Sequence, residues 1–172
     1  MIKQQSTIRN ARQEDIPAIT TIYNQGIADR VATLEVDAKS EDDVQAWLLD
    51  ERASRYETLV AESNGTITGW AALRPYSHRC AYAGVADLSI YVARDARGKG
   101  VGEQLLAALE ERARGNDFHK IVLFTFPFNA AGQRLYRKRG FREVGTFREQ
   151  GTLDGRLIDV LIMEKILEPA NS

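Results

Sequence analysis

The sequence contains very little cysteine and histidine and no long apolar run. One of its 172 residues is cysteine (Cys80) and two are histidine (His78 and His119). One cysteine cannot form an intramolecular disulfide, and neither histidine has neighbours at the spacing of zinc ligands. No 18 apolar residues run together, and Met1 to Ser6 lack the apolar core of a signal peptide. These absences predict a cytoplasmic protein without a disulfide, a metal or a membrane span.

An excess of charge of one sign is also absent. The chain carries 23 Lys and Arg against 24 Asp and Glu, which gives a net charge of -1. A neutral protein has no general attraction for nucleic acid or anionic membranes, so we expect neither as a partner. With 44% apolar and 27% charged residues, the chain can bury a core. Its length and the lack of a Pro/Gly/Ser-rich linker predict one domain over residues 1–172, with a core at about 6–167.

Hydrophobic periodicity predicts a mixed α/β fold. Runs of β-forming residues indicate seven strands, at 6–10, 58–62, 66–73, 85–92, 120–126, 141–151 and 157–166. Four helical patterns begin near residues 16, 40, 101 and 129, and the second is expected to bury Val44, Trp47 and Leu48. Asn64-Gly65 and Leu153-Asp154-Gly155 are typical of hairpin turns. The order β-α-α-β-β-β-α-β-α-β-β therefore predicts a mixed sheet with flanking helices.

The predicted strand at 85–92 has one polar face, which is unusual for a central strand. Its apolar face carries Ala86, Leu88, Ile90 and Val92, and its other face carries Val85, Asp87, Ser89 and Tyr91. The run at 120–126 is continuously apolar instead, which predicts burial on both faces. Because polar side chains are unusual on a central strand, the strand at 85–92 is a candidate for the chemistry of the protein.

A glycine-rich segment, Arg97-Gly98-Lys99-Gly100-Val101-Gly102, connects this strand to the next helix. Glycine allows the backbone to approach a ligand closely, and a helix N-terminus favours an anion. Arg94 adds positive charge, so phosphate is the expected ligand. The segment is not a P-loop, because Lys99 is followed by glycine, and Glu103 stands where a dinucleotide fingerprint requires glycine. A glycine-rich turn without a ligand is the alternative interpretation.

The same segment resembles the Q/R-x-x-G-x-G/A acetyl-CoA loop of the GNAT (GCN5-related) N-acetyltransferases. Asn129, followed by Leu135-Tyr136-Arg137-Lys138-Arg139-Gly140-Phe141, is similar to the N-x(5–6)-L/Y-x-x-x-G-F block of that family. The resemblance covers residues 6 to 167 and implies a mostly antiparallel sheet of about seven strands flanked by four helices. It also implies acetyl-CoA as cofactor, no metal, and a homodimer. By this resemblance the cofactor would contact Ser89, Tyr91, Val92, Arg97, Gly98, Lys99, Gly100, Val101, Gly102, Thr125 and Asn129.

A finer resemblance points to the phosphinothricin N-acetyltransferase branch. It rests on Ile22-Tyr23-Asn24, on His78-Arg79-Cys80-Ala81-Tyr82, and on Ala86-Asp87-Leu88-Ser89-Ile90-Tyr91-Val92. That branch acetylates the α-amino group of glutamate-like compounds such as phosphinothricin, methionine sulfoximine and arsinothricin, so the resemblance implies a resistance enzyme. The branch has glutamate where this chain has Asp87, and the shorter side chain favours proton abstraction through a water.

Acetyl transfer to an amine needs a base, because the amine is mostly protonated at pH 7. Asp87 is the candidate base, and the alternative is an ordinary strand carboxylate bonded to the backbone or to Arg79. The resemblance implies that a backbone N–H near Tyr91 or Val92 stabilises the oxyanion. It also implies that Tyr136 protonates the departing thiolate, and the alternative for Tyr136 is a packed aromatic.

Acceptor binding is predicted for one arginine and, more weakly, for five other residues. Arg79 can bind a carboxylate, phosphinate or similar group in a bidentate manner. Arg30 and Arg74 are weaker candidates for the same contact, and Tyr82, Tyr23 and Thr33 line the acceptor site by analogy. Two other activities stay open: acetylation of a protein N-terminus or another amine, and a non-catalytic acyl-CoA-binding module. A covalent route through Cys80 and His78 lacks a third, orienting residue, so we expect direct attack by the amine.

Overall fold

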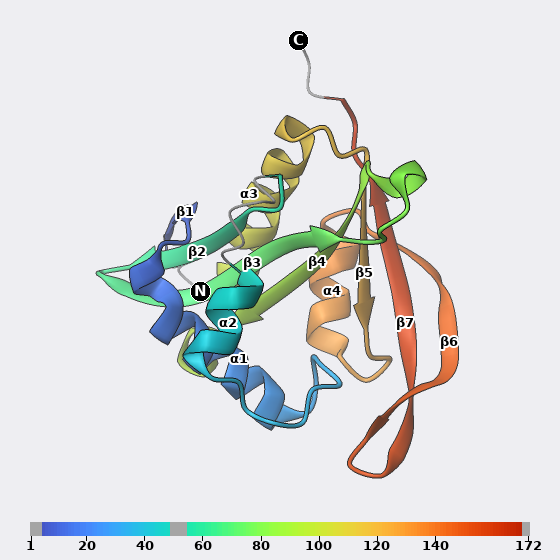
Figure 1. Cartoon of the computed structure of the whole chain (residues 1–172), viewed down its shortest axis with the longest axis horizontal. Helices are drawn as coiled ribbons and strands as arrows, with labels where there is room; N and C mark the ends of the chain where they lie inside the picture. Colours follow the sequence, from blue (N-terminus) through green and yellow to red (C-terminus); the bar gives the residue numbers. More distant parts are fainter. Residues whose placement is uncertain (1–4, 49–54, 170–172) are drawn as a thin grey trace.

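A seven-stranded sheet in the order β1-β2-β3-β4-β5-β7-β6 forms the centre of the computed structural model, which describes residues 5–48 and 55–169 (Figure 1). Neighbouring strands are antiparallel except β4 and β5, which are parallel. The strands are β1 (Thr7–Asn10), β2 (Thr58–Ser63), β3 (Thr66–Pro75), β4 (Val85–Val92), β5 (Lys120–Thr125), β6 (Arg142–Leu153) and β7 (Arg156–Ile166). The predicted mixed, mostly antiparallel sheet is confirmed.

Within the described residues, four α-helices cover the two faces of the sheet: α1 (Ile16–Asp29), α2 (Glu41–Leu48), α3 (Val101–Gly115) and α4 (Ala130–Lys138). On one face, the Tyr23 ring of α1 packs edge-on against Trp70 of β3, with ring centroids 5.8 Å apart. On the other face, Leu105 of α3 packs close to Gly69 of β3. The core therefore has an α1/α2 layer and an α3 layer, with the sheet between them.

Local sequence signals set the ends of several elements as predicted. Ser40 and Asp43 form a reciprocal capping box at the start of α2, because each backbone N–H donates to the other side chain. The Asn129 side chain accepts from the Gly132 N–H and so caps α4. In the hairpin turns, Asn64 and Asp154 have φ of 51° and 49°, and the glycine after each also has a positive φ.

Two burial predictions differ from the structure. Trp47 of α2 is 37% exposed, although its ring stacks on Tyr23 with a centroid separation of 5.5 Å, because α2 packs mainly against α1 rather than against the sheet. Phe124 of β5 is 40% exposed, so β5 is not buried on both faces. Helix α1 packs against β3 and β4, whereas Phe124 lies on the next strand of the sheet, β5, and lines a cavity.

The strands β4 and β5 separate after a short paired region. Only Val85–Asp87 of β4 pair with Lys120–Val122 of β5, and the two strands then diverge (Figure 1). The rest of β4, up to Val92, has a neighbouring strand on one side only, and that strand is β3. This divergence opens the sheet and creates the candidate site.

Candidate functional site

A cavity of about 1100 Å³ lies where β4 and β5 diverge. Its walls come from α1, β4, the glycine-rich segment, α3, β5 and α4. This volume lies just above the usual range for small-molecule sites, so the cavity can hold a large ligand. All residues predicted from the resemblance to contact the cofactor line it, namely Ser89, Tyr91, Val92, Arg97, Gly98, Lys99, Gly100, Val101, Gly102, Thr125 and Asn129, and Tyr136 lines it too.

The glycine-rich segment forms one end of the cavity and leads directly into α3. Gly98 and Gly100 have φ of 76° and 87°, values that glycine adopts without strain. Gly100 is the N-cap of α3, so the first backbone N–H groups of the helix lie at the cavity wall with no earlier turn to bond them. Because these groups carry the positive end of the helix dipole, this end of the cavity suits an anion such as a diphosphate.

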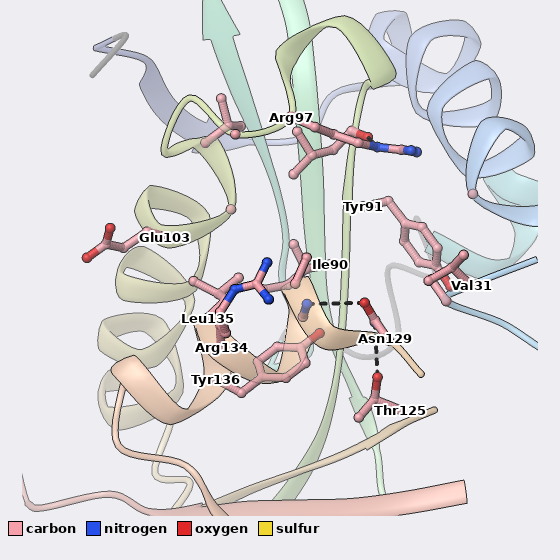
Figure 2. Close-up of a pocket in the computed structure, with 18 of the residues that line it drawn as sticks. Val31, Ile90, Tyr91, Arg97, Glu103, Thr125, Asn129, Arg134, Leu135 and Tyr136 are labelled. Atoms are coloured by element: carbon pink, nitrogen blue, oxygen red, sulfur yellow. Dashed lines mark hydrogen bonds between the residues drawn. The ribbon is translucent and has the colours of Figure 1, made fainter. Parts of the chain in front are cut away.

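Arg94, just before this segment, and Arg97, its first residue, are held by Asp29, a residue that the sequence analysis missed. The Asp29 carboxylate accepts from Arg94 Nη2 at 2.6 Å and from Arg97 Nη1 at 2.7 Å. Arg97 Nε also donates to the Val92 carbonyl at 3.2 Å, and Figure 2 shows its side chain extending toward α1. These hydrogen bonds, Arg94 first, lower the pKa of Asp29. Arg97 therefore ties the segment to α1 and β4.

The backbone of β4 presents alternate residues to the cavity. Ala93 N–H donates to the Thr68 carbonyl, which continues the β3–β4 register. Because every second residue of a strand directs its N–H and carbonyl groups to the same side, the backbone groups of Tyr91 also face β3. Ile90 and Val92 consequently turn their N–H and carbonyl groups toward the cavity, in agreement with the Arg97 bond to the Val92 carbonyl. Of the two donors predicted for an oxyanion, Val92 has this orientation and Tyr91 does not.

Asp87 lies beside Arg74 where β4 begins to leave β5. The two residues are register partners on β4 and β3, and their side chains lie on the α1/α2 face. Burial raises the pKa of Asp87 to about 6. A hydrogen bond from Leu88 N–H, at 2.8 Å, and the charge of Arg74 both lower this pKa, but by less than burial raises it. Leu88 and Ser89 line the cavity, whereas Asp87 itself lies next to the lining. A carboxylate with a pKa near neutrality can accept a proton at physiological pH.

Tyr136 enters the cavity from α4. Burial raises the pKa of its phenol to about 12, so the hydroxyl remains protonated at neutral pH. Figure 2 shows Tyr136, Asn129, Arg134 and Ile90 around one space. The Asn129 amide donates to the Thr125 hydroxyl at 3.1 Å while it caps α4, which fixes the start of this helix against β5.

An aromatic cluster on the α1/α2 face adjoins the cavity. Tyr91 stacks on Trp70 with centroids 4.9 Å apart and meets Tyr23 edge-on at 5.0 Å. The Arg74 guanidinium lies 4.2 Å above the Trp47 ring. Burial raises the pKa of Tyr23, and the nearby Thr33 side chain opposes the shift. The predicted residues Tyr23, Thr33 and Arg74 thus lie at one aromatic cluster, and Arg74 is also the register partner of Asp87.

The other predicted acceptor residues lie elsewhere. Arg79 and Tyr82 are exposed, on the connection between β3 and β4, and neither lines the cavity. The Tyr82 ring contacts Tyr76 at 6.0 Å. Cys80 and His78 are exposed on the same connection. The register brings Arg74, not Arg79, to Asp87.

Several lining residues carried little or no sequence signal. Gly26 could have been noticed as a glycine inside a helix: a Cβ there would lie 2.7 Å from the Tyr91 ring, so glycine is what allows the ring to pack against α1. Val31 and Ala32 belong to the loop after α1, and Figure 2 shows Val31 beside Tyr91. A loop position has no periodicity from which its partners can be predicted.

Two features are absent from residues 5–48 and 55–169, the part of the chain that the structure describes. Within these ranges, no three or more His, Cys, Asp or Glu side chains are grouped to hold a metal ion. No helix in this part of the chain is long and apolar enough to span a membrane.

Comparison with known proteins agrees with this geometry. An L-methionine sulfoximine/L-methionine sulfone acetyltransferase of Pseudomonas aeruginosa is 34% identical over 168 residues, which cover 97% of this chain and 98% of that protein. The structure of ribosomal-protein-alanine N-acetyltransferase from Brucella melitensis has a TM-score of 0.90 at 35% identity, covering 94% of this chain and 99% of that one. A GNAT superfamily phosphinothricin acetyltransferase from Sinorhizobium meliloti, solved with acetyl-CoA, has a TM-score of 0.89 at 28% identity, covering 96% of this chain and 93% of that one.

The chain also matches the family described as Acetyltransferase (GNAT) over residues 21–141, which is more than half of its length. The predicted resemblance is therefore confirmed at the level of the family. Because the family match, the curated relative and the fold agree, this chain belongs to the acetyltransferase (GNAT) family and is an acetyl-transfer enzyme.

Proposed function

We propose that this enzyme transfers acetyl from acetyl-CoA to the α-amino group of a small glutamate-like amino acid. The observation that carries the proposal is the pairing of Arg74 with Asp87 beside the cavity. A guanidinium suits an acidic group of the acceptor, and a carboxylate of raised pKa suits its amine. The methionine sulfoximine and phosphinothricin acetyltransferases among the relatives support this substrate class.

The cavity has the chemistry that acetyl-CoA requires. Backbone N–H groups at the start of α3 suit its diphosphate, and the apolar lining, which includes Leu135 and Val101, suits its pantetheine arm. When bound, acetyl-CoA supplies an activated thioester carbonyl. The N–H groups of Ile90 and Val92 face the cavity and can hold the negative charge that develops on the carbonyl oxygen.

In this proposal Asp87 takes the proton of the attacking amine. Its pKa of about 6 keeps it ionised at pH 7 and close enough to neutrality to act as a base. Since Asp87 lies next to the lining rather than in it, a water between the carboxylate and the amine completes the path.

Tyr136 acts on the leaving sulfur. A phenol with a pKa of about 12 is a weaker acid than a thiol, whose ordinary pKa is about 8.5, so complete proton transfer to the thiolate is uphill. The hydroxyl remains protonated and can donate a hydrogen bond to the sulfur as it gains charge. Tyr136 therefore stabilises the departing thiolate chiefly as a hydrogen-bond donor.

A thiol-release assay tests the function. Purified enzyme with acetyl-CoA should release CoA thiol with methionine sulfoximine or phosphinothricin, and kcat/KM should fall below pH about 6 as Asp87 is protonated. Asp87→Asn should lower kcat/KM by about 100-fold or more and remove this acidic limb. Acetyl-CoA binding without thiol release for any amine would contradict the proposal.

A matched pair of variants tests the acceptor site. Arg74→Lys should raise KM for the amino acid about tenfold and leave KM for acetyl-CoA nearly unchanged, because lysine cannot form the bidentate contact. Arg79→Lys, on the exposed connection, should change neither constant. A larger effect at Arg79 would move the acceptor site away from Asp87.

A second candidate function is acetylation of a protein N-terminus. It is favoured by the Brucella melitensis ribosomal-protein-alanine N-acetyltransferase, at 35% identity and a TM-score of 0.90. A short peptide with an N-terminal alanine, assayed beside the amino acids, separates the two. Preference for the peptide by kcat/KM would replace the first proposal with the second.

A further inference from the structure

The connection between α1 and α2 contacts both sides of the candidate site. Its residues Val31 and Ala32 line the cavity. Its Thr33 side chain lies close enough to the phenols of Tyr23 and Tyr91, in the aromatic cluster, to lower the pKa of both. This segment, residues 31–39, contains no helix or strand that would hold it in place. Other contacts must therefore fix Thr33.

One of these contacts is made by Arg30, which ends α1 in the left-handed conformation with φ of 57°. Its Nη1 donates to the carbonyls of Ile27 at 3.0 Å and Val36 at 3.2 Å. Its Nε donates to Asp154 Oδ2 at 2.9 Å, in the turn between β6 and β7. A single guanidinium therefore joins the end of α1, the middle of the segment and a hairpin 124 residues away in sequence.

A close apolar contact supports the same attachment. The Leu34 side chain packs on Gly151 of β6, where a Cβ would lie only 2.4 Å from Leu34 Cδ1. Glycine at this position is therefore what allows the segment to approach the hairpin. At its other end the segment is fixed to α1, because Asn24 exchanges two hydrogen bonds with the backbone of Lys39, at 2.8 and 3.0 Å. In Figure 1 the hairpin and the α1–α2 connection lie at the same end of the molecule.

We propose that Arg30 and Asp154 are positioning residues for acceptor binding: their ion pair holds residues 31–39 against the β6–β7 hairpin and so fixes Thr33 beside Tyr23 and Tyr91. The inference rests on the proposed function for its kinetic consequence. The side chains of Arg30 and Asp154 are 32% and 56% exposed, and an ion pair of this kind adds little to global stability. Its loss should consequently appear in the segment and in acceptor binding, while the fold stays intact.

The test is a double-mutant cycle with two measurements. Arg30→Ala removes all three contacts, and Asp154→Asn removes the charge while keeping a residue that tolerates the φ of this turn. By hydrogen–deuterium exchange without ligand, backbone amides of residues 31–39 should exchange about fivefold faster or more in each variant. In the thiol assay, KM for the amino acid should rise about tenfold in Arg30→Ala and less in Asp154→Asn, while KM for acetyl-CoA changes less than about twofold.

The double variant and a control complete the cycle. If the two residues act through one ion pair, the double variant should be no worse than Arg30→Ala. Arg148→Ala is the matched control, since Arg148 is an exposed arginine of the same hairpin whose ion pair with Asp159, at 3.5 Å, lies away from the segment. It should alter neither exchange in residues 31–39 nor either KM.

Three results would overturn the inference: unchanged exchange in residues 31–39, equal changes in the two KM values, or additive effects of Arg30→Ala and Asp154→Asn. A wild-type enzyme that acetylates no amine would end the proposed function alone. The exchange rates would still decide whether this ion pair holds the segment.

Discussion

At the scale of single residues, burial determines the chemistry of Asp87. Its carboxylate sits on a central strand with one backbone hydrogen bond and the charge of Arg74 nearby, yet desolvation outweighs both and raises its pKa to about 6. Asp15 shows the opposite outcome, because a hydrogen bond from Arg9 lowers its pKa although it too is buried. The difference is that Arg9 contacts both oxygens of Asp15, whereas Asp87 is solvated poorly and paired weakly.

Because desolvation of the Asp87 carboxylate outweighs its favourable contacts, we expect this residue to lower the stability of the native protein at neutral pH. The native protein holds a proton up to pH about 6 that the unfolded chain releases near 3.8, so stability falls as pH rises between these values. Asp87→Asn should therefore raise the free energy of unfolding at pH 7.5, by about 1–3 kcal/mol, and change it little at pH 4. Urea unfolding at the two pH values measures this. Asp15→Asn should lower stability at pH 7.5, and a loss of stability in Asp87→Asn at that pH would contradict the assignment.

At the scale of elements, the turn before α3 combines two requirements. The chain must reverse from β4 into a helix, and it must leave the first N–H groups of that helix accessible in the cavity. Positive φ at Gly98 and Gly100 meets both requirements without a Cβ over the ligand site. The glycine spacing in the sequence predicted this turn, although the attachment of Arg97 to Asp29 needed the position of α1.

A pair of glycine variants separates ligand binding from backbone strain. Gly98 and Gly65 have φ of 76° and 77°, and a Cβ on either would meet no atom within 4 Å. Alanine at either position should cost about 1–2 kcal/mol of stability, because the left-handed conformation is strained for other residues. Only Gly98→Ala should raise KM for acetyl-CoA, by about tenfold, since Gly65 lies in the distant β2–β3 turn. Equal KM values for the two variants would show that Gly98 does not shape the donor site.

At the scale of the whole molecule, a buried glutamate connects the elements around the cavity. Glu110 of α3 is 0% exposed and accepts from Arg139, after α4, at 2.7 Å and from Lys165 of β7 at 3.1 Å. The Lys165 ammonium also donates to the Arg139 carbonyl at the end of α4. This ion-pair group fixes α4, which carries Tyr136, against the helix that begins at the glycine-rich segment.

Removing the buried charge should destabilise the protein strongly. Glu110→Gln leaves two cations without their shared carboxylate, and breaking a buried pair in this way costs about 3 kcal/mol. Glu143→Gln breaks the exposed Arg137–Glu143 pair, whose side chains are each 52% exposed, and should cost less than about 1 kcal/mol. Chemical denaturation of the two variants provides the comparison. Similar losses would mean that Glu110 does not hold α3, α4 and β7 together.

The sequence alone determined the elements, the turns and the identity of the loop that faces the cavity. These follow from periodicity, capping and glycine, which act between residues close in the chain: Ser40 with Asp43, Asn129 with Gly132, and Asn64 with Gly65. Alternation along the fourth strand likewise placed Asp87, Ser89 and Tyr91 on one face, as the structure has them.

Only the tertiary structure decided which distant residues meet. The β3–β4 register puts Arg74 opposite Asp87 while Arg79 remains on an exposed connection, and no local pattern encodes that register. The same holds for Asp29 with Arg97, for Arg30 with Asp154 and for Glu110 with Lys165, whose partners lie 68, 124 and 55 residues apart. Such pairs form because packing of the whole core fixes the relative positions of α1, α3 and the sheet, and that packing is a property of all core residues together.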